Sequence, residues 1–227
     1  MTLLPIFSGI PIDMDIKHQA ADYISSAIAA KLKDDKSVLW LVPGGSSIEV
    51  ALLVAKSLAT RDLSNLTVTL TDERYGPVGH TDSNWKQLGD GGFDLPSATM
   101  VPVLTGVSMA ETLQHFGEAI RSAMSDVDYS IGFFGIGPDG HTAGILPGSP
   151  AETATTTTAG YDAEKFLRVT ITKSVITRLD EVIVYAVGEN KWPIVAALNG
   201  TIVDEDWPAL CLKQAGKLTI FSDYKEI

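Results

Sequence analysis

Apolar positions recur at two spacings along the chain, and the two spacings alternate. Residues 15–33 carry apolar side chains three and four positions apart, which predicts a helix, whereas the run SVLWLV at 37–42 predicts a buried strand. The same reading predicts further strands at 66–70, 129–134, 166–172, 181–188 and 217–221, with helices at about 48–58, 109–124 and from Glu189. Strands that alternate with helices predict an α/β fold: a modified doubly wound, Rossmann-like, mostly parallel sheet with flanking helices.

Polar residues mark where the helices begin and where the chain turns. Ser46 with Glu49 and Ser108 with Glu111 have the spacing of capping boxes, so each serine is predicted to begin a helix. Pro193 fits the first turn of the last helix. The segment TDERYGPVGHTDSNW at 71–85 is predicted to be a loop at a strand end, and ETATTTTAG at 152–160 an exposed connection.

Length and composition indicate one folded unit. The 227 residues are 45% hydrophobic and 20% charged, which suits a single compact domain over 1–227. The formal net charge of −11 disfavours nucleic acid and acidic membrane surfaces as partners. It also makes the basic residues informative, because an anionic substrate would need them gathered at one site.

The cysteine content and the apolar runs predict a cytoplasmic protein. Cys211 is the single cysteine, which excludes an intramolecular disulfide and a cysteine-cluster metal site. The first residues have no basic stretch or cleavage site typical of a signal peptide. Every apolar run is shorter than the roughly 20 residues of a spanning helix, so no membrane segment is expected.

The stretch GIGPDG at 135–140 has the glycine spacing of a dinucleotide-binding loop. That loop requires a long helix to begin at the glycines. Here Pro138 lies inside the loop, and glycines and prolines at 144, 147, 148 and 150 follow within ten residues. No long helix can begin there, so a nucleotide cofactor is disfavoured. A tight turn at a strand end remains, and it holds Asp139 and His141 two residues apart.

Five ordered motifs resemble the 6-phosphogluconolactonase family. They are PGGSS at 43–47, TDERYGPVGHTDSNW at 71–85, GIGPDGHTAG at 135–144, RVTIT at 168–172 and VGENK at 187–191. Departures from the family pattern are Pro43 before the two glycines, Trp85 after Asn84, and GILPG after Ala143. The resemblance covers residues 43 to 191 and implies the fold of the sugar-phosphate deaminase and isomerase group.

The resemblance implies hydrolysis of 6-phospho-D-glucono-1,5-lactone to 6-phospho-D-gluconate in the oxidative pentose phosphate pathway. The expected partner is a sugar-phosphate lactone, bound by a monomer or small homo-oligomer. This reaction needs an activated water, a pocket for the oxyanion and cations for the phosphate, but no metal or other cofactor.

His141 is the candidate general base that the resemblance selects, because a free imidazole titrates near neutral pH and can exchange a proton with water. Asp72 and Asp139 could orient the imidazole or bind sugar hydroxyls, and the sequence leaves their roles open. His80 is expected to organise its loop, whereas His18 and His115 fall in predicted helices.

Substrate binding is expected from residues at several strand ends. Arg74, Arg168 and Lys191 are assigned to the phosphate, since arginine can bind it bidentately. Arg168 is predicted to face away from the apolar side of its strand. Gly44 and Gly45 would bring backbone N–H groups close to an anion. Ser46 and Thr142 complete the expected set, with Ser46 first a helix cap; it lacks the context of a serine nucleophile.

The two alternative functions are a glucosamine-6-phosphate deaminase/isomerase and a sugar-phosphate-sensing domain. A glucosamine-6-phosphate deaminase/isomerase typically has Tyr after Asp-Glu and a carboxylate just beyond the His; here Arg74 stands in the first place, and the first acid after His141 is Glu152. A sugar-phosphate-sensing domain of a transcription regulator would need a DNA reader. No helix-turn-helix or basic patch is recognisable before residue 37, so the lactonase is favoured.

Overall fold

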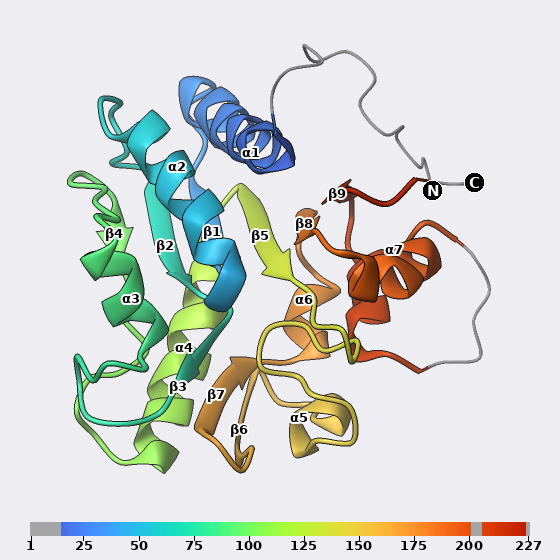
Figure 1. The fold of residues 1–227 in the computed structure, drawn as a ribbon. Helices are drawn as coiled ribbons and strands as arrows, with labels where there is room; N and C mark the ends of the chain where they lie inside the picture. Colours follow the sequence, from blue (N-terminus) through green and yellow to red (C-terminus); the bar gives the residue numbers. More distant parts are fainter. Residues whose placement is uncertain (1–14, 201–205, 226–227) are drawn as a thin grey trace.

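The computed structural model describes residues 15–200 and 206–225. Its centre is a six-stranded sheet of order β4-β2-β1-β5-β8-β9, in which each neighbouring pair is parallel (Figure 1). The strands are β1 (Val38–Val42), β2 (Leu66–Leu70), β4 (Thr99–Met100), β5 (Tyr129–Gly135), β8 (Glu181–Ala186) and β9 (Leu218–Ser222). The predicted α/β fold with a mostly parallel sheet is confirmed.

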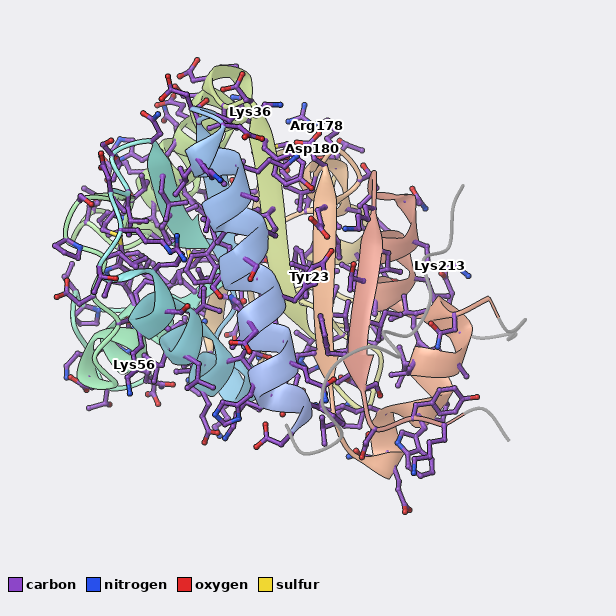
Figure 2. All side chains as sticks on the ribbon, turned by 90° about the horizontal axis from the view of Figure 1, so that it is seen from above. Tyr23, Lys36, Lys56, Arg178, Asp180 and Lys213 are labelled. Carbon is purple, nitrogen blue, oxygen red and sulfur yellow. The ribbon has the colours of Figure 1, made fainter. Side chains whose placement is uncertain are left out.

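Helices cover both faces of this sheet. Helices α1 (Ile16–Lys33) and α2 (Ile48–Leu58) pack side by side on one face (Figures 1 and 2). The β4-to-β5 connection crosses the sheet in the direction opposite to the β1-to-β2 connection, so right-handed crossovers place α4 (Met109–Asp126) on the other face. The shorter helices are α3 (Asn84–Asp90), α5 (Pro150–Thr153), α6 (Lys173–Ile176) and α7 (Trp192–Leu198), with 3₁₀ helices at Gly45–Ser47, Glu189–Lys191 and Pro208–Gln214.

The central strands are buried because their apolar runs do not alternate with polar residues. All five residues of β1 have no exposed surface, as expected for a parallel strand covered by helices on both sides. The largest fully buried side chains are Trp40, Phe133 and Phe134, all on β1 or β5. The core therefore lies on the strand pair at the middle of the sheet.

A second sheet, which the sequence did not predict, lies beside the first. Its order is β3-β7-β6, formed by Asp72–Arg74, Leu167–Ile171 and Thr158–Asp162, and both pairings are antiparallel. The expected loop at 71–85 thus contains β3 and the start of α3, and the expected connection at 152–160 contains the end of α5 and the start of β6. Both predictions of irregular structure were wrong for these segments.

Contacts distant in the sequence explain why these short strands form. Gly160 of β6 lies against α4, where a Cβ would come within 2.5 Å of the Met109 side chain, and Thr158 donates a hydrogen bond to the Leu113 carbonyl at 2.9 Å. Strand β3 pairs with β7, almost a hundred positions further along. Local hydrophobic periodicity carries no signal for such pairings.

The end of the sheet where β5 and β8 begin carries a buried polar cluster. Glu181 accepts hydrogen bonds from Tyr23 of α1 at 2.5 Å and Tyr129 of β5 at 2.8 Å, and it pairs with Lys217 at 2.8 Å. Figure 2 shows Tyr23 between α1 and the last strands. Burial, together with Glu181, raises the pKa of Tyr129. The cluster ties α1 to the sheet and satisfies a carboxylate that has almost no exposed surface.

The two predicted capping boxes have opposite outcomes. At Ser108 the box is complete, because the serine hydroxyl accepts from the Glu111 N–H and the Glu111 carboxylate accepts from the Ser108 N–H. At Ser46 it is absent: α2 begins after Ser47, no side-chain cap forms, and Glu49 pairs with Lys17 at 2.7 Å instead. The glycine turn before α2 ends in a 3₁₀ turn, which moves the helix start past Ser46.

We expect Ser108→Ala to lower the free energy of unfolding by about 1 kcal/mol, because it removes a formed helix cap. Ser46→Ala is the matched control and should change it by less than about 0.5 kcal/mol, since Ser46 caps no helix. Urea unfolding of both variants beside the wild type measures this difference. Equal losses would contradict the assignment of the two helix starts.

Candidate active site

The site lies where the strand order of the central sheet reverses. From β1 the chain moves to β2 and β4 on one side, and from β5 it moves to β8 and β9 on the other. Loops that leave adjacent strands in opposite directions leave a hollow between them, the usual ligand position in an open α/β sheet. The loops here are 43–47 after β1 and 136–141 after β5.

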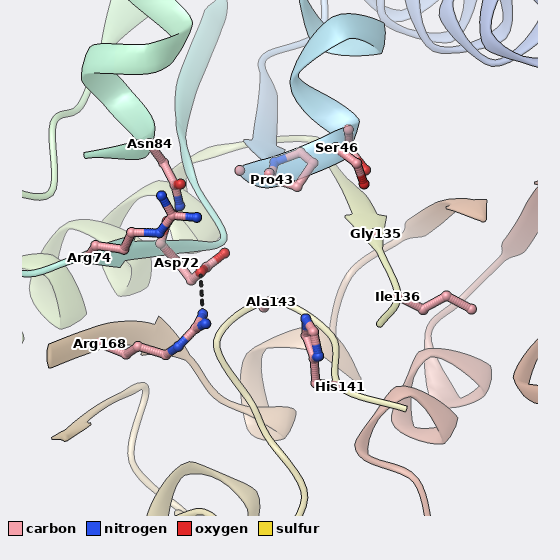
Figure 3. A pocket seen from close by; sticks show the side chains of 13 residues that line it. Pro43, Ser46, Asp72, Arg74, Asn84, Gly135, Ile136, His141, Ala143 and Arg168 are labelled. Carbon is pink, nitrogen blue, oxygen red and sulfur yellow. Dashed lines mark hydrogen bonds and ion pairs between the residues drawn. The ribbon is translucent and has the colours of Figure 1, made fainter. Parts of the chain in front are cut away.

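A pocket occupies this hollow, and the second sheet closes its remaining side (Figure 3). Its lining combines the loop after β1, the loop after β5, and residues of β3, β7 and α3. The lining residues are Pro43, Gly44, Gly45, Ser46, Ser47, Asp72, Arg74, Asn84, Gly135, Ile136, His141, Ala143 and Arg168. Seven of the ten residues predicted for the site thus line one pocket: Gly44, Gly45, Ser46, Asp72, Arg74, His141 and Arg168.

His141 and Asp139 form a hydrogen-bonded pair in the turn after β5. The ring Nδ1 lies 2.6 Å from Asp139 Oδ1, and the same oxygen accepts from the His141 backbone N–H at 3.2 Å. Burial would raise the pKa of Asp139, but the backbone N–H and the ring of His141 outweigh it and lower that pKa. An ionised Asp139 holds the proton on Nδ1, which leaves Nε2 as the ring nitrogen that can accept one.

Glycines make room for this pair. A Cβ on Gly137 would lie 2.2 Å from the His141 ring, and Gly140 has a φ of +81°, which favours glycine. After Gly140 the chain forms single bridges at Thr142 and Ile145, and the next helix, α5, is four residues long. The glycine spacing therefore serves the histidine turn, and the long helix of a dinucleotide fold is absent between Gly140 and α5.

Thr142 does not offer its side chain to the pocket. The residue has no exposed surface, and its hydroxyl donates to the Gly135 carbonyl at 3.0 Å. The expectation that this side chain binds substrate does not fit that position. Its hydrogen bond instead joins the two ends of the histidine turn. The following residue, Ala143, lines the pocket with a φ of +48°, a strained conformation for a residue with a Cβ.

Asp72 lies buried on the opposite side of the pocket from His141. Its carboxylate is 3.6 Å from Arg168 Nη1 and accepts a hydrogen bond from the Thr71 hydroxyl at 3.0 Å. Burial raises the pKa of Asp72, against the lowering effect of Arg168 and Thr71. Asp72 is thus placed to hold Arg168, whereas Asp139 is the carboxylate that contacts the imidazole.

The antiparallel pairing of β3 with β7 sets two arginines directly opposite each other. Arg74 is the register partner of Arg168, and like charges in that position repel. Arg168 is paired with Asp72, whereas the Arg74 guanidinium donates to the Asp82 carbonyl at 3.0 Å and lies over the Phe166 ring, with no ion pair to a described residue. The pocket lining therefore carries two arginines against one carboxylate, Asp72, in a protein of net charge −11.

Lys191 lies outside this pocket, in the next hollow. That hollow is lined by Gly45, Ser46, Ile48, Glu49, Gln87, Tyr185, Val187 and Lys191. Burial lowers the pKa of Lys191, and Asp223 opposes the effect. The two hollows share Gly45 and Ser46, so the hollow of Lys191 and the pocket of the arginines meet at the glycine turn. Of the three cations predicted to converge, Arg74 and Arg168 line one pocket and Lys191 lines the neighbouring hollow.

Glu73 is an organising residue that the sequence analysis did not single out. Its carboxylate is fully buried and accepts from Ser83 Oγ at 2.9 Å and from the backbone N–H groups of Arg74, Asn84 and Trp85. Burial raises the pKa of Glu73, and these hydrogen bonds oppose the rise. His80 adds a contact from Nε2 to the Arg74 carbonyl at 2.9 Å, in line with its expected role in this loop.

Asn84 is the second residue that was missed. It is the first residue of α3, is almost fully buried and lines the pocket. Its side-chain Nδ2 donates to the Asp72 carbonyl at 2.9 Å. The sequence signals were the motif at 71–85, which contains Asn84, and Ser83, which caps α3 by accepting from the Lys86 N–H at 3.1 Å. A recognised cap would have placed Asn84 at a helix start beside a strand end.

Residues 15–200 and 206–225 contain neither a cluster of metal-ligating side chains nor a membrane-spanning helix. Within these ranges, no cluster of three or more His, Cys, Asp or Glu side chains is placed to hold a metal ion. No helix in the same residues has the length and apolar character needed to cross a membrane.

Comparison with known proteins places this geometry in a family. The chain is 30% identical over 155 residues to a 6-phosphogluconolactonase from Pseudomonas aeruginosa. The alignment covers 65% of this chain and 63% of that relative. The chain thus matches less than two thirds of the length of that curated relative.

Two solved structures have the same fold. A 6-phosphogluconolactonase from Trypanosoma cruzi superposes with a TM-score of 0.77 at 21% identity, over 91% of this chain and 90% of that one. A monomeric glucosamine-6-phosphate deaminase superposes with a TM-score of 0.73 at 18% identity, over 91% and 92%. Residues 13–220 match the model of the family described as glucosamine-6-phosphate isomerases/6-phosphogluconolactonase, and the chain belongs to that family.

Proposed function

We propose that the protein hydrolyses 6-phospho-D-glucono-1,5-lactone to 6-phospho-D-gluconate in the oxidative pentose phosphate pathway. The observation that carries the proposal is one pocket with His141, hydrogen-bonded to Asp139, on one side and the opposed Arg74–Arg168 pair on the other. A base that can activate water and cations that can hold an anion are what this reaction requires. The 6-phosphogluconolactonases among its relatives support the same substrate.

In the proposed reaction, His141 acts as base and then as acid. Its Nε2 takes a proton from water as the water oxygen attacks the lactone carbonyl carbon, and Asp139 stabilises the resulting imidazolium. The tetrahedral intermediate then collapses: the bond to the ring oxygen breaks, and that oxygen takes the proton from His141. Backbone N–H groups of Gly44 and Gly45 are the proposed partners of the oxyanion or the phosphate.

The proposed phosphate partners are Arg74, Arg168 and Lys191. Arg74 has no carboxylate within ion-pair distance among the described residues, and a dianion near it would relieve the repulsion across β3 and β7. Lys191 is half-buried and burial lowers its pKa, so an anion next to it would stabilise its charged form. A phosphate at the Gly45–Ser46 turn would lie between the two cation groups.

Deaminase chemistry fits the pocket less well. It calls for a further acid or base beyond the histidine. Glu152, the first acid after His141, accepts from the Gly148 N–H at 2.6 Å and pairs with Lys173 at 3.6 Å, away from the pocket lining. A sugar-phosphate sensor would have no need of the oriented imidazole.

We expect His141→Ala to lower kcat for the lactone by roughly 10²- to 10⁴-fold, because it removes the general base. The rate of loss of fresh lactone, corrected for spontaneous hydrolysis, measures this. His115→Ala, on the exposed surface of α4, is the control and should leave the rate unchanged. Wild-type protein that does not exceed the spontaneous rate would overturn the proposal, and ammonia release from glucosamine 6-phosphate would then support the deaminase.

We expect Lys191→Gln to raise KM for the phosphorylated lactone by about tenfold or more, since one charge-assisted hydrogen bond to the phosphate is lost. Hydrolysis of unphosphorylated glucono-1,5-lactone should not change. Lys56→Gln on α2 is the matched control, because it removes the same charge outside both hollows. An equal effect of Lys191→Gln on both lactones would contradict its assignment to the phosphate.

A further inference from the structure

The side-chain amide of Asn84 is held in one orientation on the pocket wall. Its Nδ2 donates to the Asp72 carbonyl at 2.9 Å, and its backbone N–H donates to Glu73 Oε1 at 2.6 Å. The reversed amide would place its oxygen against the Asp72 carbonyl, so the hydrogen bond fixes which end is which. Figure 3 shows Asn84 on the side of the pocket that carries Arg74 and Asp72.

The glycine turn after β1 covers the face of this amide. A Cβ on Gly44 would lie 2.2 Å from Asn84 Oδ1 and 2.4 Å from Nδ2, so the backbone at 44 is in close contact with the whole amide group. Such a contact blocks rotation of the amide. The position of Oδ1 is therefore set before any ligand arrives.

Asn84 Oδ1 has no hydrogen-bond donor among the described residues, although it is buried. A buried side-chain carbonyl oxygen normally accepts at least one hydrogen bond. Arg168 also lines the pocket, and its Nε is likewise buried without an acceptor among the described residues. The pocket lining thus contains a buried acceptor and a buried donor that the described residues leave unpaired.

The unused acceptor distinguishes between the parts of the proposed substrate. A phosphate dianion and a lactone carbonyl are acceptors themselves and cannot donate to Oδ1. The ring hydroxyls at C2, C3 and C4 can donate. The unpaired Arg168 Nε of the same lining is also suited to a polyol, because each hydroxyl can accept as well.

We propose that Asn84 recognises a ring hydroxyl of the bound sugar, which donates a hydrogen bond to Oδ1. This assignment rests on the proposed function and extends it, since it makes Asn84 a specificity residue of the same pocket. It follows that discrimination against sugars without that hydroxyl comes from the wall formed by α3 and the glycine turn, apart from the histidine and the cations.

The test compares kcat/KM for the lactone and its 2-, 3- and 4-deoxy analogues with wild type and Asn84→Ala. In the wild type, kcat/KM for one analogue should be about tenfold lower than for the parent lactone, because that analogue loses one hydrogen bond. Asn84→Ala should lose about the same factor on the parent and nothing further on that analogue, because the partner of the hydroxyl is already gone. Asn84→Ser serves as a second variant should the alanine protein not fold.

Ser83→Ala is the matched control for a structural effect. It removes the cap of α3 and a hydrogen bond to Glu73 without removing a group from the pocket lining, so any loss should be the same for all four lactones. If Asn84→Ala lowered kcat/KM by the same factor for the parent lactone and for every deoxy analogue, the hydroxyl assignment would be overturned. Turnover of the parent lactone by the wild type would still support the lactonase. Wild-type protein inactive on the parent lactone would remove both.

Discussion

The parallel pairing of β1 with β5 is the constraint on which the site depends. These two strands form the centre of the sheet, and burial of their apolar side chains on both faces keeps them adjacent. Because the chain leaves them toward opposite edges, the loops at their carboxyl ends diverge. The glycine turn and the histidine turn therefore face each other across a hollow that core packing maintains.

The second sheet supplies the charges, and Thr71 fixes it to the first. The Thr71 N–H donates to the Val42 carbonyl at 2.9 Å, and its own carbonyl accepts from Ile171 at 3.0 Å. One buried residue is thus bonded to the end of β1 and to β7. This junction fixes the position of the two arginines and Asp72 relative to the central sheet. The Glu73 carboxylate then fixes the start of α3 beside them.

Local sequence patterning predicted five of the six central strands, all but the two-residue β4, and the capping box at Ser108, because each of these signals lies within a short stretch of the sequence. It was insufficient where distant partners decide. Strand β3 has three residues and forms only because β7 pairs with it. Ser46 does not cap α2, because the 3₁₀ turn that follows the glycines shifts the start of the helix to Ile48. Ordered motifs identified seven pocket residues, but the burial of Thr142 and the separate hollow of Lys191 are properties of the folded chain. Asn84 and Glu73 were missed because a polar residue in a loop motif carries no sign of its burial.

The contact between Gly44 and the Asn84 amide links two positions forty residues apart. A side chain at 44 has no space while Asn84 is present, since even a methyl group would overlap the amide. A smaller residue at 84 would have to come first in any lineage that replaced the glycine. The two positions are therefore expected to change in a fixed order, and a residue larger than glycine at 44 should be tolerated only together with a smaller residue at 84.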